Sequence, residues 1–207
     1  MFYLVKTPWW LKKIYPSCLW NLPRGDKKIY LTFDDGPHPV ATPFVLDTLQ
    51  AYQAKATFFC IGKNVELYPE MYRRILLEGH RVGNHTHNHL NGWKAEDAGY
   101  LDNVLMAARC IDSDLFRPPY GRITRFQIDC LTKSKPGFRI IMWDVLSGDF
   151  DTSLTAARCS RNVIKNAQPG SVVVFHDSEK AFERLKEALP GVLDYFTALG
   201  FEFQGIR

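Results

Sequence analysis

The chain has 207 residues, of which 46% are hydrophobic and 23% charged, so it can bury the core of one domain and is neither disordered nor fibrous. Its net charge is only +4 and its basic residues are dispersed, which excludes the dense basic stripe of a nucleic-acid-binding protein. The five cysteines lie far apart and include no C-x-x-C pair, so we expect neither a disulfide framework nor a thiolate zinc site.

Residues 1–26 are expected to be an N-terminal extension that packs on or near a domain formed by residues 27–207. Lys6 interrupts the first apolar run, which is too short for a signal-peptide core or a membrane span, and this predicts a cytoplasmic protein. Residues 9–15 are aromatic and basic, and we expect them to pack against their own domain. The alternative is contact of residues 1–20 with a membrane surface, which would place the protein at the inner membrane.

The rest of the chain alternates between short apolar runs typical of strands and amphipathic segments typical of helices. The predicted helices cover residues 42–52, 69–78, 95–113, 124–134, 153–167 and 178–199, with Thr42 as the N-cap of the first and a break or kink at Pro190-Gly191 in the last. The predicted strands cover residues 28–33, 56–61, 80–84, 115–117, 137–144, 171–175 and 201–203.

Seven strands that alternate with helices predict parallel βα units, arranged either as a barrel or as an open sheet. The first strand is not followed by a G-x-G-x-x-G motif, which argues against a dinucleotide-binding fold. Polar clusters follow five of the strands, and the C-terminal ends of the strands form the active-site face of a parallel barrel. These clusters are Asp34-Asp35, residues 84–89, residues 117–120, Asp149 and His176-Asp177.

His85 and His89 are four residues apart, and on a helical turn this spacing would direct both imidazoles to one point. A carboxylate from Asp34 or Asp35 would complete a set of three ligands and leave an open position, as in catalytic zinc sites. His87 lies between the two histidines and is expected to point away. The spacing alone does not decide which of the two aspartates would be the ligand.

The sequence resembles the polysaccharide deacetylase family, the NodB-like carbohydrate esterases of family four. Five motifs carry the resemblance, in the family's order: T-F-D-D-G-P at residues 32–37, H-T-x-x-H at residues 85–89, R-x-P-Y at residues 117–120, Asp149, and V-F-H at residues 174–176. Phe150 and Val174 stand where the family often has Trp and Leu. The resemblance implies an α/β fold, a distorted (β/α)7 TIM-like barrel of the NodB type.

The resemblance also implies the roles of the residues in these motifs. Asp35, His85 and His89 would bind a divalent metal, usually zinc, with cobalt or nickel as substitutes. Asp34 would be the general base that deprotonates a metal-activated water, and His176 the general acid that protonates the leaving amine.

Other residues would support these groups. Arg117 would orient Asp34, Asp149 would orient His176, and the backbone N–H of Tyr120 would stabilise the oxyanion. The side chains expected to contact the substrate are Tyr120, Pro119, Phe150 and Trp93.

The predicted function is a metal-dependent hydrolase that removes the acetyl group from an N-acetylated sugar in a glycan, acting as a monomer without nucleic acid. One alternative is the deacylation of a smaller N-acyl or O-acetyl substrate. A second alternative is a catalytically silent carbohydrate-binding protein, which would ordinarily lack part of the set formed by the base, the metal ligands and the acid.

Overall fold

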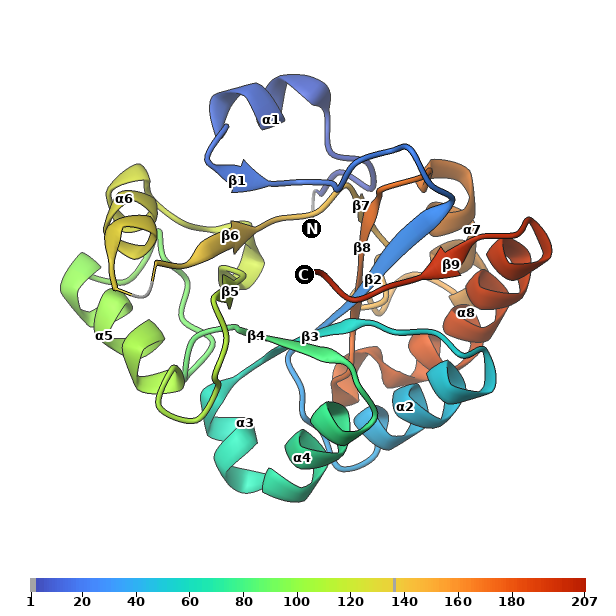
Figure 1. Ribbon diagram of the computed structural model, residues 1–207, viewed down its shortest axis with the longest axis horizontal. Helices are drawn as coiled ribbons and strands as arrows, with labels where there is room; N and C mark the ends of the chain where they lie inside the picture. Colours follow the sequence, from blue (N-terminus) through green and yellow to red (C-terminus); the bar gives the residue numbers. More distant parts are fainter. Residues whose placement is uncertain (1–2, 136) are drawn as a thin grey trace.

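The computed structural model describes residues 3–135 and 137–207 and shows a curled parallel sheet surrounded by helices, a distorted α/β barrel (Figure 1). The sheet order is β1-β6-β5-β4-β3-β2-β8-β7, β9 also pairs with β2, and all of these pairs are parallel. The strands are β1 (Cys18–Leu19), β2 (Lys28–Asp34), β3 (Thr57–Cys60), β4 (Arg81–Asn84), β5 (Leu115–Phe116), β6 (Arg139–Ile141), β7 (Val145–Leu146), β8 (Val172–His176) and β9 (Glu202–Phe203).

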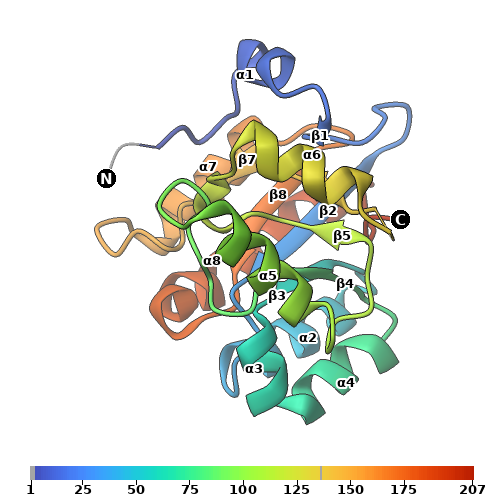
Figure 2. The same cartoon turned by 90° about the vertical axis from the view of Figure 1, so that its left-hand side faces the viewer.

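Most of the helices lie on the outside of the sheet, while α1 lies beside the strand ends near β1 (Figures 1 and 2). None of the helices described within residues 3–135 and 137–207 is long and apolar enough to cross a membrane. The helices are α1 (Trp9–Ile14), α2 (Ala41–Ala51), α3 (Gly62–Leu67), α4 (Pro69–Leu77), α5 (Asp97–Ala107), the 3₁₀ turn η1 (Pro119–Gly121), α6 (Arg125–Lys133), α7 (Ala156–Asn166) and α8 (Glu179–Ala198).

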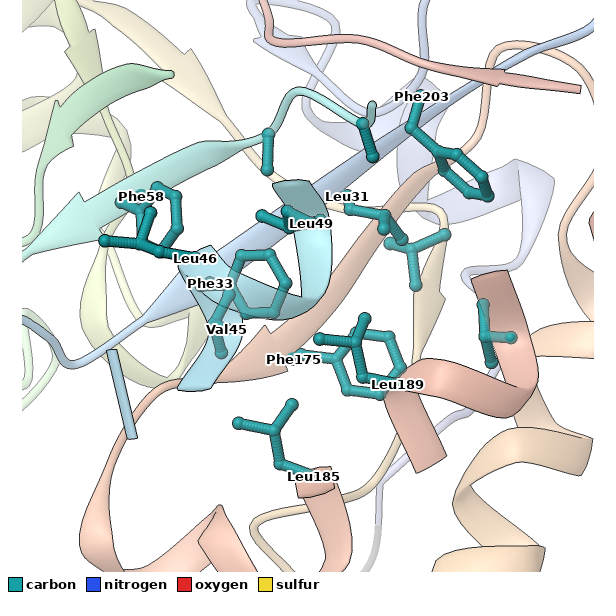
Figure 3. Close-up of a cluster of buried hydrophobic side chains, with 14 of the residues drawn as sticks. Leu31, Phe33, Val45, Leu46, Leu49, Phe58, Phe175, Leu185, Leu189 and Phe203 are labelled. Carbon is teal, nitrogen blue, oxygen red and sulfur yellow. The ribbon is translucent and has the colours of Figure 1, made fainter. Parts of the chain in front are cut away.

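The main core lies between the sheet and the helices α2, α7 and α8 (Figure 3). Alternate residues of β2, Ile29, Leu31 and Phe33, are fully buried there, as the period of a strand requires. Phe33 stacks between Phe58 of β3 and Phe175 of β8, with ring centroids 5.1 and 6.1 Å away. The packing on this side fixes β2, so the residues that follow it start from a rigid position.

The number of strands and four features of the helices differ from the sequence prediction. Nine strands rather than seven are present among the described residues, because Cys18–Leu19 pairs with β6 as β1, and because the predicted strand 137–144 is shortened to β6 and the chain then pairs with β8 as β7. The predicted helix 95–113 ends at Ala107, and Ser113 instead turns the chain by donating to the Val82 carbonyl. Helix α3 was not predicted.

The predicted N-cap was also wrong, and the last helix is not broken at Pro190. Helix α2 begins at Ala41 after Val40, and the Thr42 hydroxyl donates to Asp177 instead of capping the helix. Helix α8 continues through Pro190, because residues on both sides of it, including Leu189 and Leu193, remain fully buried against the sheet.

The N-terminal segment, defined here as residues 3–22, lies along the part of the barrel where the chain passes from β6 to β7. Cys18 and Leu19 pair in parallel with β6, and Lys6 forms an antiparallel bridge with Val145 of β7. Asp144 anchors the segment, because its fully buried carboxylate accepts hydrogen bonds at 2.6 Å from both Lys6 and Lys12.

The aromatic residues of the N-terminal segment do not all pack as expected. Leu11 and Tyr15 pack against a buried cluster that contains Trp20, but Trp9 is 69% exposed and Trp10 is 49% exposed. Lys13 lies over the Trp9 ring at 4.9 Å. Residues 1 and 2, which belong to the predicted extension, lie outside the described residues.

Candidate active site

Two of the predicted catalytic residues meet at the ends of adjacent strands. In the register of β2 and β8, Asp34 is the partner of His176, so both side chains stand at the C-terminal edge of the sheet. Asp35 follows β2 directly and has a φ of 80°, a left-handed conformation that turns its side chain away from the regular strand alternation. Asp34 and Asp35 are adjacent in the sequence, but their carboxylates therefore point in different directions.

Arg117 holds the Asp34 side chain in place. Its guanidinium is fully buried, and Nη1 donates to Asp34 Oδ1 at 2.6 Å and to Thr32 Oγ1 at 2.7 Å. Nε and Nη2 donate to the carbonyl oxygens of Ile141 and Met142. A buried guanidinium with all of these partners cannot easily change its position, so the Asp34 carboxyl group is held in a defined orientation.

The loop after β4 brings the two predicted imidazoles together, but not on a helical turn. Residues 85–89 are not helical, and Thr86 and His89 have φ values of 62° and 56°. The loop is held by amides that the sequence analysis did not single out. Asn84 Oδ1 accepts from the Thr86 N–H, and Asn103 Oδ1 accepts from the N–H groups of His87 and Asn88.

Asp35, His85 and His89 converge, with one ligand atom from each within 4.8 Å of the others. Asp35 Oδ1 lies 3.2 Å from His89 Nε2 and 3.8 Å from His85 Nε2, and it is buried without a hydrogen-bond partner among the described residues. Burial would raise the pKa of Asp35, but the surrounding imidazoles hold it well below its usual range.

The tautomer of His85 shows why this arrangement fits a metal ion. His85 Nδ1 lies 2.7 Å from the Arg117 carbonyl oxygen, which can only accept, so Nδ1 carries the proton and the Nε2 lone pair faces Asp35. Burial lowers the pKa of His85 to about 4, which keeps the imidazole neutral near pH 7. A cation satisfies a carboxylate oxygen and a nitrogen lone pair that face each other, and this donor set suits a divalent metal.

His176 is held on the other side of the site by Asp149. Asp149 is fully buried, and its Oδ1 lies 2.8 Å from His176 Nδ1 while its Oδ2 accepts from the His176 N–H at 2.7 Å. Burial opposes protonation of His176, but the charge and hydrogen bond of Asp149 outweigh it and raise the pKa to about 9. The imidazole is therefore protonated near pH 7.

Asp177 is a supporting residue whose role the sequence analysis missed. Its fully buried carboxylate accepts from the Gly36 N–H at 3.1 Å and from the Thr42 hydroxyl at 2.5 Å, and burial raises its pKa to about 8. A Cβ on Gly36 would lie only 2.0 Å from this carboxylate, so the turn after Asp35 requires glycine. Its position next to His176 in the sequence was the available signal.

Backbone strain is concentrated at the site. Five non-glycine residues among those described have a positive φ, and four of them are Asp35, Thr86, His89 and Tyr120. Such conformations persist only where the surrounding structure imposes them, and they gather at functional positions. Tyr120 has a φ of 61° in the turn η1, and its ring lies 4.6 Å from that of His89.

A cavity of about 570 Å³ opens over these groups and is lined by Asp34, Asp35, His85, His89 and His176. Three of the predicted substrate-binding residues, Tyr120, Phe150 and Trp93, also line it. Pro119 does not line it, because it is buried inside the turn η1.

Trp93 and Phe150 contribute differently to the cavity. Trp93 is 56% exposed, its Nε1 donates to the Ile123 carbonyl, and the Arg122 guanidinium covers one face of its ring at 4.1 Å. The Phe150 ring packs against the His176 imidazole at 5.2 Å.

A parallel α/β barrel with a carboxylate bound to an arginine, a histidine bound to a carboxylate and a His-His-Asp set at the C-terminal ends of its strands has the arrangement typical of a hydrolase active site. Comparison with known proteins gives the family. Residues 21–133 match the profile of the polysaccharide deacetylases. The chain belongs to this family, and it is a hydrolase of carbon–nitrogen bonds other than peptide bonds.

Several relatives are similar over most of their length. A peptidoglycan-N-acetylglucosamine deacetylase of Bacillus cereus is 34% identical over 190 residues, which are 89% of this chain and 88% of that protein. A chitooligosaccharide deacetylase of a Bradyrhizobium species is 40% identical over 161 residues, 74% of this chain and 72% of that protein. A solved structure of a peptidoglycan N-acetylglucosamine deacetylase with a naphthyl N-hydroxybenzamide has a TM-score of 0.84 and 30% identity, covering 97% of this chain and 95% of that one.

Proposed function

We propose that the protein is a metal-dependent deacetylase that hydrolyses the N-acetyl amide of N-acetylglucosamine units in a glycan. The observation that carries the proposal is the buried Asp35 Oδ1, which faces two imidazole nitrogens without a hydrogen bond while a base and an acid flank it. The names of the relatives support the substrate class, since they act on peptidoglycan N-acetylglucosamine and on chitooligosaccharides.

Asp35, His85 and His89 would hold the metal ion, with Zn²⁺ as the preferred ion for two imidazoles and one carboxylate. When bound, this ion acidifies a water molecule and polarises the amide carbonyl. The Arg117 carbonyl keeps the proton of His85 on Nδ1, so that Nε2 remains available as a ligand.

Asp34 acts as the general base and takes the proton of the attacking water. A bound ion would acidify this water, so a carboxylate is a sufficient base for it. The contact of Asp34 Oδ1 with Arg117 Nη1 leaves the second carboxylate oxygen for this proton. Arg117 therefore orients the base and does not contact the substrate.

His176 acts as the general acid and donates the proton on Nε2 to the leaving nitrogen. Asp149 keeps it protonated near pH 7 and, because it engages Nδ1, leaves the Nε2 proton directed toward the cavity. The backbone N–H of Tyr120 stabilises the developing oxyanion, and the exposed rings of Tyr120 and Trp93 supply surfaces on which sugar rings stack.

A panel of N-acetylated substrates tests this proposal. Acetate release would be measured on chitooligosaccharides, peptidoglycan fragments and small N-acetyl or O-acetyl compounds, with and without a chelator. We expect chelator-sensitive release from at least one of the glycans. Release from the small compounds alone would instead support a small-molecule deacylase. No release from any substrate even with added Zn²⁺ would support a silent carbohydrate-binding protein.

A further inference from the structure

An arginine lies on a tryptophan at the rim of the catalytic cavity, and the proposed deacetylation does not use it. The guanidinium carbon of Arg122 is 4.1 Å from the centre of the Trp93 ring, and both residues line the cavity. Tyr120, two residues before Arg122, packs its ring against that of His89 at 4.6 Å. Arg122 and Trp93, called the rim pair here, therefore lie beside the proposed metal ligands.

Hydrogen bonds of the surrounding backbone hold the rim pair in place. The Arg122 carbonyl accepts from the Gly92 N–H at 3.1 Å, and the Trp93 indole N–H donates to the Ile123 carbonyl at 3.0 Å. A Cβ on Gly92 would lie only 2.5 Å from the Arg122 carbonyl oxygen, so this close approach requires glycine. Gln127 also donates to the Gly92 carbonyl. The rim pair is therefore positioned before any substrate binds.

The Arg122 guanidinium has donors that no other described residue uses. A guanidinium this close to an aromatic ring stacks on its face, and its N–H groups then lie in its own plane and point past the ring. Within residues 3–135 and 137–207, the Arg122 side chain forms no hydrogen bond or ion pair besides its contact with Trp93. Its N–H groups match the geometry of a planar carboxylate, which can accept two of them at once.

The charge of Arg122 is not balanced within the cavity. Asp34 is paired with a buried arginine, His176 is paired with a buried aspartate, and Asp35 faces two imidazoles. Lys180 also lines the cavity and has no partner among the described residues, but it is exposed and its ammonium group is not held on an aromatic ring. The cavity therefore attracts an anion, and Arg122 is the cation whose position is fixed.

The exposure of the rim pair indicates which part of a glycan it reaches. Trp93 is more than half exposed, whereas Asp35 and the two imidazoles that it faces are mostly buried. The N-acetyl group that is hydrolysed lies over the buried ligands, so a sugar that lies on the rim is a neighbouring unit of the glycan. Trp93 offers this sugar a ring edge and Arg122 offers it a cation.

We propose that Arg122, held on Trp93, binds a carboxylate on the sugar next to the N-acetylglucosamine that is hydrolysed, so that the enzyme prefers acidic glycans to neutral ones. This inference rests on the proposed deacetylation and adds the class of glycan on which it acts. The carboxylate belongs either to a lactyl ether, as in muramic acid, or to a uronic acid. Arg122 recognises the planar anion that these two sugars share.

Two matched pairs of substrates test the preference. One pair is the disaccharide of N-acetylglucosamine and N-acetylmuramic acid and its methyl amide. The other is a tetrasaccharide of alternating N-acetylglucosamine and glucuronic acid and its methyl ester. Acetate release is measured with Zn²⁺ present, and we expect kcat/KM to be about fivefold higher for the acid in at least one pair, which identifies the source of the carboxylate. Equal values in both pairs would overturn the proposal and leave the deacetylase function intact.

Variants of Arg122 separate recognition from a purely structural role. Arg122→Gln removes the charge and should abolish the preference for the acid, whereas Arg122→Lys keeps the charge, loses the planar donors and should retain only part of it. Arg125→Gln is the matched control and should keep the preference, because Arg125 is exposed at the start of α6 and is not among the cavity-lining residues. If Arg122→Gln lowers kcat/KM equally for the acid and the neutral substrate, Arg122 only supports Trp93 and the proposal is wrong.

Two further measurements decide the remaining outcomes. Lys180→Gln should keep most of the preference, and if it abolishes the preference while Arg122→Gln does not, the assignment to Arg122 is wrong. If no substrate is hydrolysed, the proposed function fails, and calorimetric titration with the same pairs still decides the inference. Tighter binding of the acid than of its neutral partner, lost in Arg122→Gln, would support it, and equal binding would contradict it.

Discussion

Two regions surround the same cavity and are held together by different forces. The strand-end region, formed by the residues that follow β2, β4 and β8, is charged, strained and connected by hydrogen bonds between elements. The N-terminal segment is mostly apolar toward the cavity, and besides its backbone pairing it is anchored by one buried carboxylate, Asp144. Residues 3–20 also precede the part of the chain that matches the family profile. We infer that the first region determines the chemistry and that the second shapes the cavity that receives the substrate.

The largest effect is expected at Asp34. Asp34→Asn keeps a hydrogen-bond acceptor for Arg117 but removes the base, so kcat/KM should fall by about 10³-fold or more, while the bound metal and the thermal stability are retained. Acetate release and elemental analysis of the same sample measure this. Asp129→Asn, a surface carboxylate outside the cavity, is the control. Activity within tenfold of the wild type would contradict the assignment of the base.

The anchor of the N-terminal segment should affect stability rather than metal binding. Asp144→Asn leaves Lys6 and Lys12 without their buried counter-charge, and we expect the free energy of unfolding to fall by about 3 kcal/mol. Urea denaturation measures this change. Asp26→Asn removes a fully exposed ion pair with Lys28 and should not change stability measurably. If folded Asp144→Asn protein lost its metal, the conclusion that the N-terminal segment does not affect the metal site would be contradicted.

The strand-end region could be largely anticipated from the sequence, because its chemistry depends on residue types at the ends of parallel strands. Asp35, His85 and His89 were predicted to converge, and they do, although through a strained loop and not a helical turn. The geometry could not be anticipated, since it depends on amides such as Asn84 and Asn103 that hold backbone groups across the fold.

The wall formed by the N-terminal segment was less predictable. Asp144 was predicted only as the last residue of the strand 137–144, and its partners Lys6 and Lys12 are more than 130 residues away in the sequence. β1 and β7 have two residues each, too few for a periodic signal. The Asp144 anchor and the two short strands both depend on contacts between distant parts of the chain, which local sequence patterns do not encode.

A buried histidine lies at each end of β4, His80 before it and His85 after it. Protonation of His80 should change the stability of the fold, and His85 belongs to the active site. His80 accepts a hydrogen bond from the Ala56 N–H, and burial lowers its pKa to about 4. A lowered pKa means that His80 stabilises the neutral-pH fold above about pH 6.5, and that stability is lost as the pH falls toward 4.

From pH 7 to pH 5 the free energy of unfolding should therefore fall by about 2 kcal/mol through His80. Urea denaturation of the wild type and of His80→Gln at both pH values measures this contribution as the difference between their pH dependences. An identical pH dependence in the two proteins would show that the acid sensitivity comes from other groups, such as those at the active site.

The smallest effect is expected where the two regions touch. The Tyr3 ring packs on Phe150 at 4.9 Å, and Phe150 in turn packs on His176, so Tyr3 is a positioning residue for the acid. Tyr3→Ala should lower kcat by about fivefold and shift the alkaline limb of the pH–rate profile, with the metal content unchanged. Tyr3→Phe keeps the ring and loses only the bond to Asp151, so it should behave as the wild type. A fall confined to KM would contradict the positioning role.

The most direct test of the account is the return of activity to a chelated enzyme. Acetate release from an N-acetylglucosamine oligomer would be measured before chelation, after it, and after the addition of one equivalent of Zn²⁺, in the wild type and in His85→Ala. The account predicts that chelation abolishes release, that Zn²⁺ restores it in the wild type, and that His85→Ala does not recover. Release that persists after complete removal of the metal, or equal recovery in both proteins, would contradict it.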